Sequence, residues 1–320
     1  MDLEQRIDIV VDRIQEIVEN YKQKAVYALF SGGDDSLVMA YLASHHPLFK
    51  GVIFANTLTG DKETVEYVRK TSKTMGWNYY ETKPDIHNRY PAILATRGVP
   101  NPQMHAEVFG RLKGKPWDKM RTQLARKNKC KRTEILFVTG IRKAESTKRM
   151  QTVTLEKVYL NKNGSLRSVW GAPICDLQRS DLEDVFAQAK DLSRNMHAYK
   201  FGASRECGCK ATEGTQDPIL EKQFYPLYYE RRRLQYKLAQ IAYELQEFEV
   251  ENGFIDRDEA TIPTLGIRDI NKPLQKELFE YRYEGDTVDG TPFLCVGCEN
   301  KAGEDIDKEL WVTKQHKISA

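Results

Sequence analysis

The stretch Ala25-Val26-Tyr27-Ala28-Leu29-Phe30-Ser31-Gly32-Gly33-Asp34-Asp35-Ser36 decides the fold of this 320-residue chain. Its first six residues are all apolar and predict a buried strand, which the Ser-Gly-Gly sequence ends. Residues 37–44 then have the pattern of a helix. A strand, a glycine turn and a helix in this order are typical of an α/β protein with a parallel sheet.

Strands and helices continue to alternate on both sides of this stretch. Residues 3–21 carry apolar side chains at spacings of three and four, which predicts an amphipathic helix. The other elements predicted in this half are strands at 52–55, 77–81 and 134–140 and a helix at 63–75. Because parallel strands are joined by right-handed crossovers, we expect a parallel sheet with helices on both faces.

The pattern changes after residue 174. Helices are predicted at 181–196 and 227–250, and the second carries an apolar stripe. The stripe consists of Leu234, Leu238, Ile241, Leu245 and Phe248. We therefore expect two parts, a first domain of residues 1–195 and a mostly helical C-terminal region of residues 196–320 that carries a cysteine cluster.

Composition restricts the class of protein. Apolar residues make up 40% and charged residues 30% of the chain, which excludes collagen, a coiled coil or a disordered tail as the main structure. No apolar run approaches the roughly 18 residues that a membrane span needs. The first six residues lack the apolar core of a secretion signal. With only six cysteines, we expect a reducing, cytoplasmic setting without membrane contact.

Charge is unevenly distributed along the chain. The net charge is +3, yet residues 111–149 hold 14 Lys and Arg against 3 Asp and Glu, an excess of 14 − 3 = +11. A basic block of this size fits a nucleic acid or another phosphate-rich partner. A solvated basic surface is an equally acceptable interpretation.

The glycine turn after the first strand has the chemistry of an anion site. Gly32 and Gly33 allow the backbone to approach a ligand, and the helix that follows presents free N–H groups to anions. Ser31 and Ser36 add hydroxyl donors, and Asp35 could hold a divalent metal ion on a polyphosphate. The alternative is a plain glycine turn whose polar residues cap the helix.

The segment from Ser31 to Ser36 resembles the PP-loop, Ser-Gly-Gly-X-Asp-Ser, of the adenine nucleotide alpha-hydrolases. That superfamily includes ATP pyrophosphatases and the phosphoadenosine phosphosulfate (PAPS) reductase family. The X position is Asp34 where Lys is frequent, which indicates either Mg²⁺ use or a weakened phosphate contact. Residues 56–64, 138–149 and 170–181 resemble further motifs of PAPS reductase-like proteins, in the family's order.

The resemblance implies a site for ATP, or for PAPS or its relative APS, with Mg²⁺. The residues implied to bind the nucleotide are Ser31, Gly32, Gly33, Asp35, Ser36, Thr59, Gly60, Gly140, Arg142, Glu145 and Ser146. Asp35, Arg142 and Arg149 are the expected catalytic residues. The two arginines could neutralise a polyphosphate by bidentate contacts, or they could form ion pairs with Glu145 on one helix face.

Four cysteines form two close pairs, Cys207 with Cys209 and Cys295 with Cys298. Four thiolates would satisfy Zn²⁺ or a 4Fe-4S cluster, and we expect these pairs to share one metal site. A redox dithiol and unrelated thiols are the alternatives. Cys175 and Cys130 are expected to be ordinary small side chains.

The resemblance implies chemistry on an adenine nucleotide, but the chain departs from one branch of the family. Sulfonucleotide reductases use a Glu-Cys-Gly-X-His motif near the C-terminus, whereas this chain has Glu206-Cys207-Gly208 in mid-chain without the His. We therefore favour an ATP pyrophosphatase or adenylating enzyme in sulfur transfer or nucleic-acid modification. A sulfonucleotide reductase that releases sulfite and a non-catalytic nucleotide-binding protein are the alternatives. A homodimer or a partner protein is left open.

Overall fold

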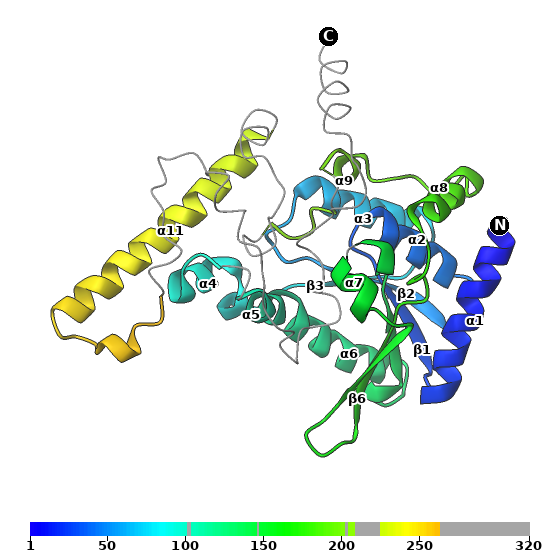
Figure 1. Ribbon diagram of the computed structural model, residues 1–320, viewed down its shortest axis with the longest axis horizontal. Coiled ribbons are helices and arrows are strands. Elements are labelled where there is room, and N and C mark those ends of the chain that lie inside the picture. The colour runs from blue at the N-terminus through cyan, green and yellow to red at the C-terminus, as the bar shows by residue number, and fades with distance from the viewer. Residues whose placement is uncertain (101–103, 146, 202–203, 209–224, 263–320) are drawn as a thin grey trace, which may run out of the picture.

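The computed structural model describes residues 1–100, 104–145, 147–201, 204–208 and 225–262. Its centre is a six-stranded sheet in the order β3-β2-β1-β4-β6-β5 (Figure 1). Neighbouring strands are parallel except β5, which pairs antiparallel with β6 at the edge. The expected parallel sheet is therefore confirmed, with one antiparallel edge strand added.

The strands are short, and the central ones are fully buried. Their bounds are β1 Ala25–Leu29, β2 Phe49–Ala55, β3 Tyr79–Thr82, β4 Ile135–Val138, β5 Glu156–Leu160 and β6 Leu166–Gly171. Every residue of β1 and β4 is buried. Continuous apolar strands of this kind fit a sheet that is covered on both faces.

Helices cover both faces of the sheet, as expected. The longer ones are α1 Leu3–Tyr21, α2 Asp34–Ala43, α3 Lys62–Thr74, α4 Tyr90–Arg97, α6 Lys115–Lys127, α8 Arg179–Gln188 and α11 Pro226–Glu251. The shorter ones are α5 His105–Phe109, a π-helical turn at Gly110–Gly114, α7 Thr147–Thr152 and α9 Met196–Phe201. Short 3₁₀ turns lie at Ile86–Asn88, Arg132–Glu134, Lys143–Glu145 and Arg257–Glu259.

Two apolar clusters hold these layers together. On one face, Ile14 and Ile17 of α1 pack with Leu37 of α2 and with side chains of α8 against the sheet. On the other face, Trp117 and Leu124 of α6 pack on β1 and β4. Burial of apolar area on both sides is the main stabilising term for such a sheet.

Some sequence-based element assignments need correction. The helix predicted at 181–196 is α8, which ends at Gln188. Residues 189–195 are not helical, and Asn195 there donates a hydrogen bond to the Gly32 carbonyl (3.0 Å). The β5–β6 hairpin and helices α4, α5 and α6 were not predicted. The helix at 227–250 is confirmed as α11.

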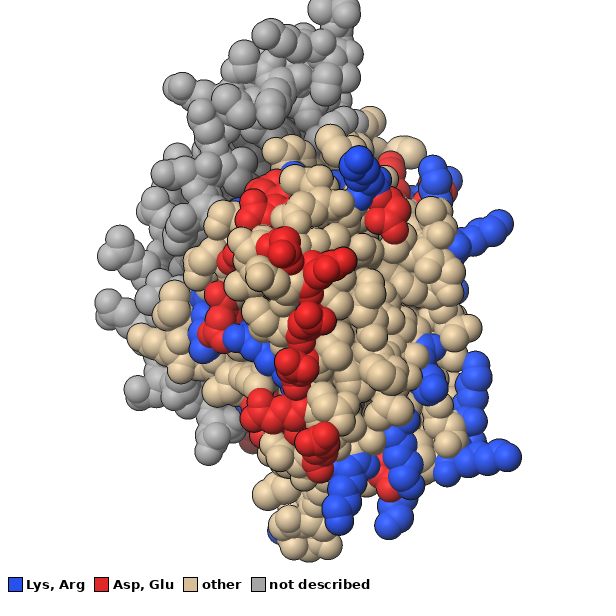
Figure 2. Space-filling model, turned by 90° about the vertical axis from the view of Figure 1, so that its right-hand side faces the viewer, with Lys and Arg blue, Asp and Glu red and all other residues tan. Residues whose placement is uncertain are grey.

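The outer surface over α1 is acidic. Figure 2 shows a line of acidic side chains running down this side of the molecule. The exposed acidic residues of α1 are Glu4, Asp8, Asp12, Glu16 and Glu19. A polyanion would be repelled along this line. Within the described part of the chain, no helix has both the length and the apolar character needed to cross a membrane.

Candidate functional site

The sheet changes direction between β1 and β4. From β1 the chain adds β2 and then β3 on one side, and β4 is placed on the other side of β1. Open α/β sheets bind ligands outside the carboxyl ends of the strands at such a switch point. The 31–36 loop follows β1, and Gly140 and Arg142 follow β4, so the predicted site residues meet at this position.

The 31–36 loop is held in a compact turn by its two serines. The Ser31 N–H donates to Ser36 Oγ (3.1 Å), and the Ser36 hydroxyl donates to the Gly33 carbonyl (2.9 Å). The two hydroxyl oxygens lie 2.9 Å apart. Both serines thus shape the loop; Ser36 is buried, and Ser31 is partly exposed.

Glycine is required at the centre of the turn. Gly32 has φ +87°, and a Cβ there would lie 2.9 Å from side-chain carbons of Thr64 and Val68 in α3. Gly33 is the N-cap of α2 and has no side chain with which to cap it. The first-turn N–H groups of α2 therefore remain suited to an anionic ligand.

The end of β4 is pressed against the start of α2. A Cβ on Gly140 would lie 2.6 Å from the backbone carbonyl carbon and oxygen of Asp35. Only glycine permits this approach without a backbone shift. The glycine predicted from sequence at the edge of the sheet is therefore part of the same site as the 31–36 loop.

The two arginines expected to bind phosphate have different partners. Arg142 is buried, with 1% of its surface exposed, and its Nε donates to Asp35 Oδ1 (2.6 Å). Glu145 accepts from the Arg142 backbone N–H (2.9 Å) and forms an ion pair with Arg149. The expected pairing with Glu145 is thus present for Arg149, whereas the Arg142 side chain pairs with the loop. Ser146 lies outside the described residues.

Asp34, at the unusual X position of the loop, is neutralised by arginines. Arg179 donates to Asp34 Oδ2 (2.7 Å), and Arg194 lies 3.7 Å from the same oxygen. Burial raises the pKa of Asp34, and the two guanidinium groups oppose that rise. Neither arginine was singled out from sequence, because they follow Asp34 by more than 140 residues.

A second loop, residues 56–60 after β2, meets residues 204–208. The Thr57 hydroxyl donates to the Glu206 carbonyl (2.8 Å), and a Cβ on Gly60 would lie 2.4 Å from that carbonyl oxygen. The Gly208 N–H donates to Thr59 Oγ1 (3.1 Å). The predicted residues Thr59 and Gly60 are therefore in direct contact with the 204–208 segment.

A buried polar cluster supports this second loop. Asp61 is 2% exposed and accepts from Arg205 Nε (2.5 Å), while His197 Nε2 lies 2.8 Å from its carboxylate. Burial disfavours the Asp61 carboxylate, but hydrogen bonds from His197 and Arg205 outweigh burial and hold its pKa below the ordinary value. This cluster was missed from sequence and fixes 204–208 beside the site.

The described cysteines differ in their surroundings. Cys207 is half-buried and accepts from the Thr59 hydroxyl (3.6 Å). Cys175 is buried, and burial followed by the neighbouring Asp176 raises its pKa to about 11. Burial also raises the pKa of Cys130. Within the described ranges no group of metal-binding side chains gathers; Cys209, Cys295 and Cys298 lie outside those ranges.

The basic block of residues 111–149 is divided between paired and exposed side chains. Arg111 pairs with Glu107, Lys113 with Glu206, and Arg132 with Asp118. The exposed basic residues of α6 and the turn after it are Lys115, Lys119, Arg126, Lys127, Lys129 and Lys131. The block therefore contributes both structural ion pairs and a basic surface.

Comparison with known proteins places these features in a family. The family model described as "Phosphoadenosine phosphosulfate reductase domain" matches residues 25–195, which include β1, the 31–36 loop and the end of β4. No curated protein sequence matches the chain.

Three solved structures are similar to this chain at low sequence identity. A PAPS reductase from Candida auris is 14% identical, with 60% of this chain and 84% of that chain covered and a TM-score of 0.41. An NH3-dependent NAD synthetase from Campylobacter jejuni is 16% identical, with 80% and 98% covered and a TM-score of 0.40. A tRNA thiolase from Methanococcus maripaludis with its 4Fe-4S cluster is 13% identical, with 84% and 90% covered and a TM-score of 0.36.

Proposed function

The chain belongs to the phosphoadenosine phosphosulfate reductase domain family, and we propose that it binds an adenine nucleotide at the switch point between β1 and β4. The observation that carries this proposal is the contact between the two segments that end these strands. Gly140 lies against the Asp35 backbone, and the Arg142 side chain reaches Asp35. Both segments therefore border the N-terminus of α2, where phosphate groups are stabilised.

Each residue near this position has a distinct task in the proposed complex. The first-turn N–H groups of α2 and the hydroxyl of Ser31 hold phosphate oxygens, while Ser36, whose hydroxyl donates to the Gly33 carbonyl, fixes the shape of the loop. Arg142 and Arg149 lower the electrostatic cost of bringing a polyphosphate to the site. The Asp35 carboxylate, with 28% of its side chain exposed, fits Mg²⁺, which commonly uses one or two carboxylates together with the phosphates of its nucleotide.

We propose adenylation as the reaction. An oxygen of the acceptor attacks the alpha-phosphorus of ATP, the bond from that phosphorus to the bridging oxygen breaks, and pyrophosphate leaves. The acceptor then carries AMP, and its proton is lost to solvent. Positioning and charge neutralisation account for most of the rate enhancement in such transfers, and we assign these two tasks to the 31–36 loop and the arginines.

The described thiols favour adenylation over sulfonucleotide reduction. A reductase needs a thiolate that attacks sulfur. Cys175 is buried with a raised pKa, and the pKa of Cys130 is raised as well, so neither is suited to this task. Cys207 is proposed as a ligand of zinc or a 4Fe-4S cluster together with Cys209, Cys295 and Cys298, which would leave no reactive thiol at the site.

Sulfite release is the second candidate, and one observation favours it. Cys207 lies against Thr59, in the loop that borders the site. If no metal is bound, its thiol becomes the best placed nucleophile of the described residues. A non-catalytic nucleotide-binding protein is the third candidate.

One pair of assays separates these candidates. The purified chain is incubated with ATP, Mg²⁺ and single-stranded RNA or DNA as the acceptor, or with PAPS and a dithiol reductant, and pyrophosphate and sulfite are quantified. The proposal expects pyrophosphate from ATP, with the activity retained when Cys130 and Cys175 are both replaced by Ser. Sulfite from PAPS without pyrophosphate from ATP would overturn it, and nucleotide binding without either product would favour the non-catalytic protein.

The basic surface of α6 is proposed to dock a nucleic acid acceptor. Its exposed lysines lie on the helix that packs over β1 and β4, on the sheet face opposite α1. Phosphate contacts of this kind weaken steeply with salt, which makes the proposal testable.

A further inference from the structure

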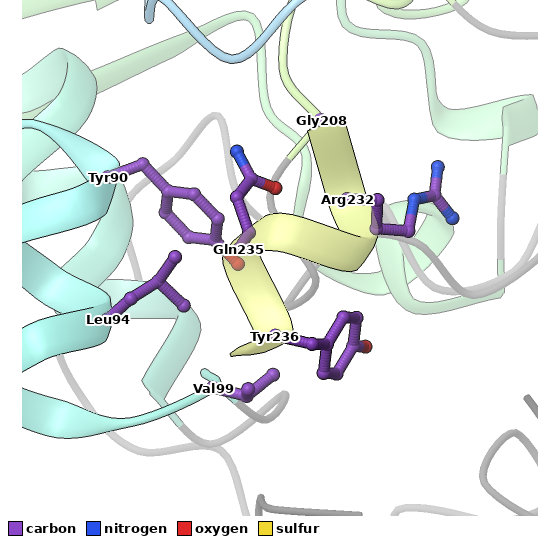
Figure 3. A pocket seen from close by; sticks show the side chains of 7 residues that line it. All are labelled: Tyr90, Leu94, Val99, Gly208, Arg232, Gln235 and Tyr236. Carbon is purple, nitrogen blue, oxygen red and sulfur yellow. The ribbon is translucent and has the colours of Figure 1, made fainter. Parts of the chain in front are cut away.

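Helix α11 is apolar on two opposite faces. Its inner face packs against α4, and Ala239 there is fully buried in a cluster with Ile93 and Leu94. Figure 3 shows Gln235 and Tyr236 of α11 across a small pocket from Tyr90 and Leu94 of α4. This packing uses one side of the helix and leaves the opposite side outward.

The outer face carries a continuous apolar stripe. Its members are Leu234, Leu238, Ile241, Leu245 and Phe248, with exposed fractions between 37% and 57%. Phe254, beyond the end of the helix, stacks near Phe248 with ring centroids 6.3 Å apart. Figure 1 shows α11 at the edge of the molecule, with no described element along its outer side. A helix that is apolar on both faces is normally buried on both.

The spacing of the stripe identifies the kind of partner. Its five residues follow one another at intervals of four, three, four and three. This is the 3.5-residue repeat with which two α-helices pack along their whole length. A second helix therefore fits the stripe better than a sheet edge or a small ligand.

Charge along α11 is complementary to the same helix reversed. Arg231 and Arg232 turn inward, toward loop 56–60 and the pocket. The exposed charged residues of α11 are Arg233 and Lys237 in its first half and Glu244 and Glu251 in its second. In an antiparallel pair of α11 helices each basic half lies beside an acidic half. In a parallel pair like charges would face each other, which is destabilising.

We propose that the outer face of α11 is the interface of a homodimer in which two α11 helices pair antiparallel. Ile241 is the middle residue of the stripe, so it would lie near the two-fold axis. Leu238 would then face the partner's Leu245, and Lys237 would lie beside the partner's Glu244. An interface of this kind is isologous, because the same patch serves both copies.

The inference is independent of the proposed function, because it uses no residue of the nucleotide site. Lys237 and Glu244 are both exposed, so both side chains are available to a second copy of the chain. Glu244 accepts only a local hydrogen bond from Gln240 (2.9 Å) among the contacts described, so exchanging its charge leaves the fold of the monomer undisturbed.

The test is the mass of the full chain in solution, measured by sedimentation equilibrium over a range of concentrations. The dimer predicts twice 37.0 kDa. Ile241→Glu should abolish association, because it would place two carboxylates at the axis. The matched control Leu160→Glu changes an equally exposed apolar residue, 58% exposed, on β5 and should leave the dimer intact.

A charge exchange tests the antiparallel direction. Lys237→Glu or Glu244→Lys alone should weaken the dimer about tenfold, since each turns two attractive surface contacts into repulsive ones. The double variant should restore wild-type affinity. A monomeric wild-type chain at every concentration, as expected if residues 263–320 of the same chain cover the stripe, would overturn the proposal. Failure of the double variant to restore association would overturn it as well.

Discussion

Arg142 Nε donates to Asp35 Oδ1 across 2.6 Å, and this bond links the segment after β4 to the first turn of α2. Arg142 is 1% exposed, while Asp35 keeps 28% of its side chain in contact with solvent. The buried Arg142 guanidinium therefore fixes the partly exposed Asp35 carboxylate at the edge of the site. A bound polyphosphate and its metal ion would meet a carboxylate whose position is already fixed.

Replacing Arg142 by Met should lower the stability of the folded protein. The change leaves the partly buried Asp35 without its partner, so the free energy of unfolding should fall by about 2–4 kcal/mol. Urea denaturation measures this loss. The control Arg167→Met breaks an exposed pair with Asp118 at 3.0 Å and should cost less than about 1 kcal/mol. Equal losses for the two variants would contradict the structural role of Arg142.

The Asp61 cluster should make the free energy of unfolding fall at low pH. Because the pKa of Asp61 is held low in the folded protein, its stabilising effect is present above its unfolded-state pKa, about 4, and is lost as pH falls through the folded value. Asp61→Asn should lower the free energy of unfolding by about 3 kcal/mol at neutral pH.

The difference between wild type and Asp61→Asn should narrow as pH falls below about 4. Denaturation curves recorded from pH 7 to pH 3 provide the measurement. Asp12→Asn, on the exposed face of α1, is the control and should follow wild type throughout. A constant difference between wild type and Asp61→Asn across this range would show that Asp61 is not a stabilising carboxylate.

The basic surface of α6 should bind nucleic acid in a salt-dependent way. The triple change of Lys119, Lys127 and Lys131 to Glu should weaken binding of single-stranded RNA or DNA by at least about tenfold at about 50 mM salt. Fluorescence anisotropy measures the affinity. A control triple change of Lys50, Lys70 and Lys73, exposed elsewhere, should have a smaller effect. Undetectable binding by the wild-type chain would contradict the prediction and favour the alternative that residues 111–149 form a solvated basic surface.

Local sequence signals were enough for the first strand, its loop and the stripe of α11. The apolar run of β1 and the glycines after it are contiguous, so neighbouring residues determine their structure. The end of β4 could be placed beside this loop from the sequence, because the carboxyl ends of parallel strands lie at the same edge of a sheet. The predicted roles of the site residues and the boundary at residue 195 stay predictions.

Contacts between distant residues could not be obtained in this way. His197 and Arg205 follow Asp61 by 136 and 144 residues, and polar pairs of that separation have no periodic signature. The β5–β6 hairpin did have a signal, because Asn163-Gly164 lies between two alternating segments, as in many hairpin turns. Helices α4 and α6 likewise carry Pro91 and Pro116 in their first turns, where proline is common.

The most direct test of the account is the affinity for ATP in the presence of Mg²⁺, measured by isothermal titration calorimetry on wild type and on Gly33→Val. Gly33 is the N-cap of α2, and a Cβ there would lie 3.2 Å from Ser204 Cβ and 3.8 Å from Ser31 Oγ, so a branched Val side chain would displace the groups that border the proposed phosphate position. Gly110→Val is the matched control, since a Cβ at Gly110 meets no atom within 4 Å. The account predicts that wild type and Gly110→Val bind ATP and that folded Gly33→Val does not. Unchanged ATP affinity in folded Gly33→Val would contradict it.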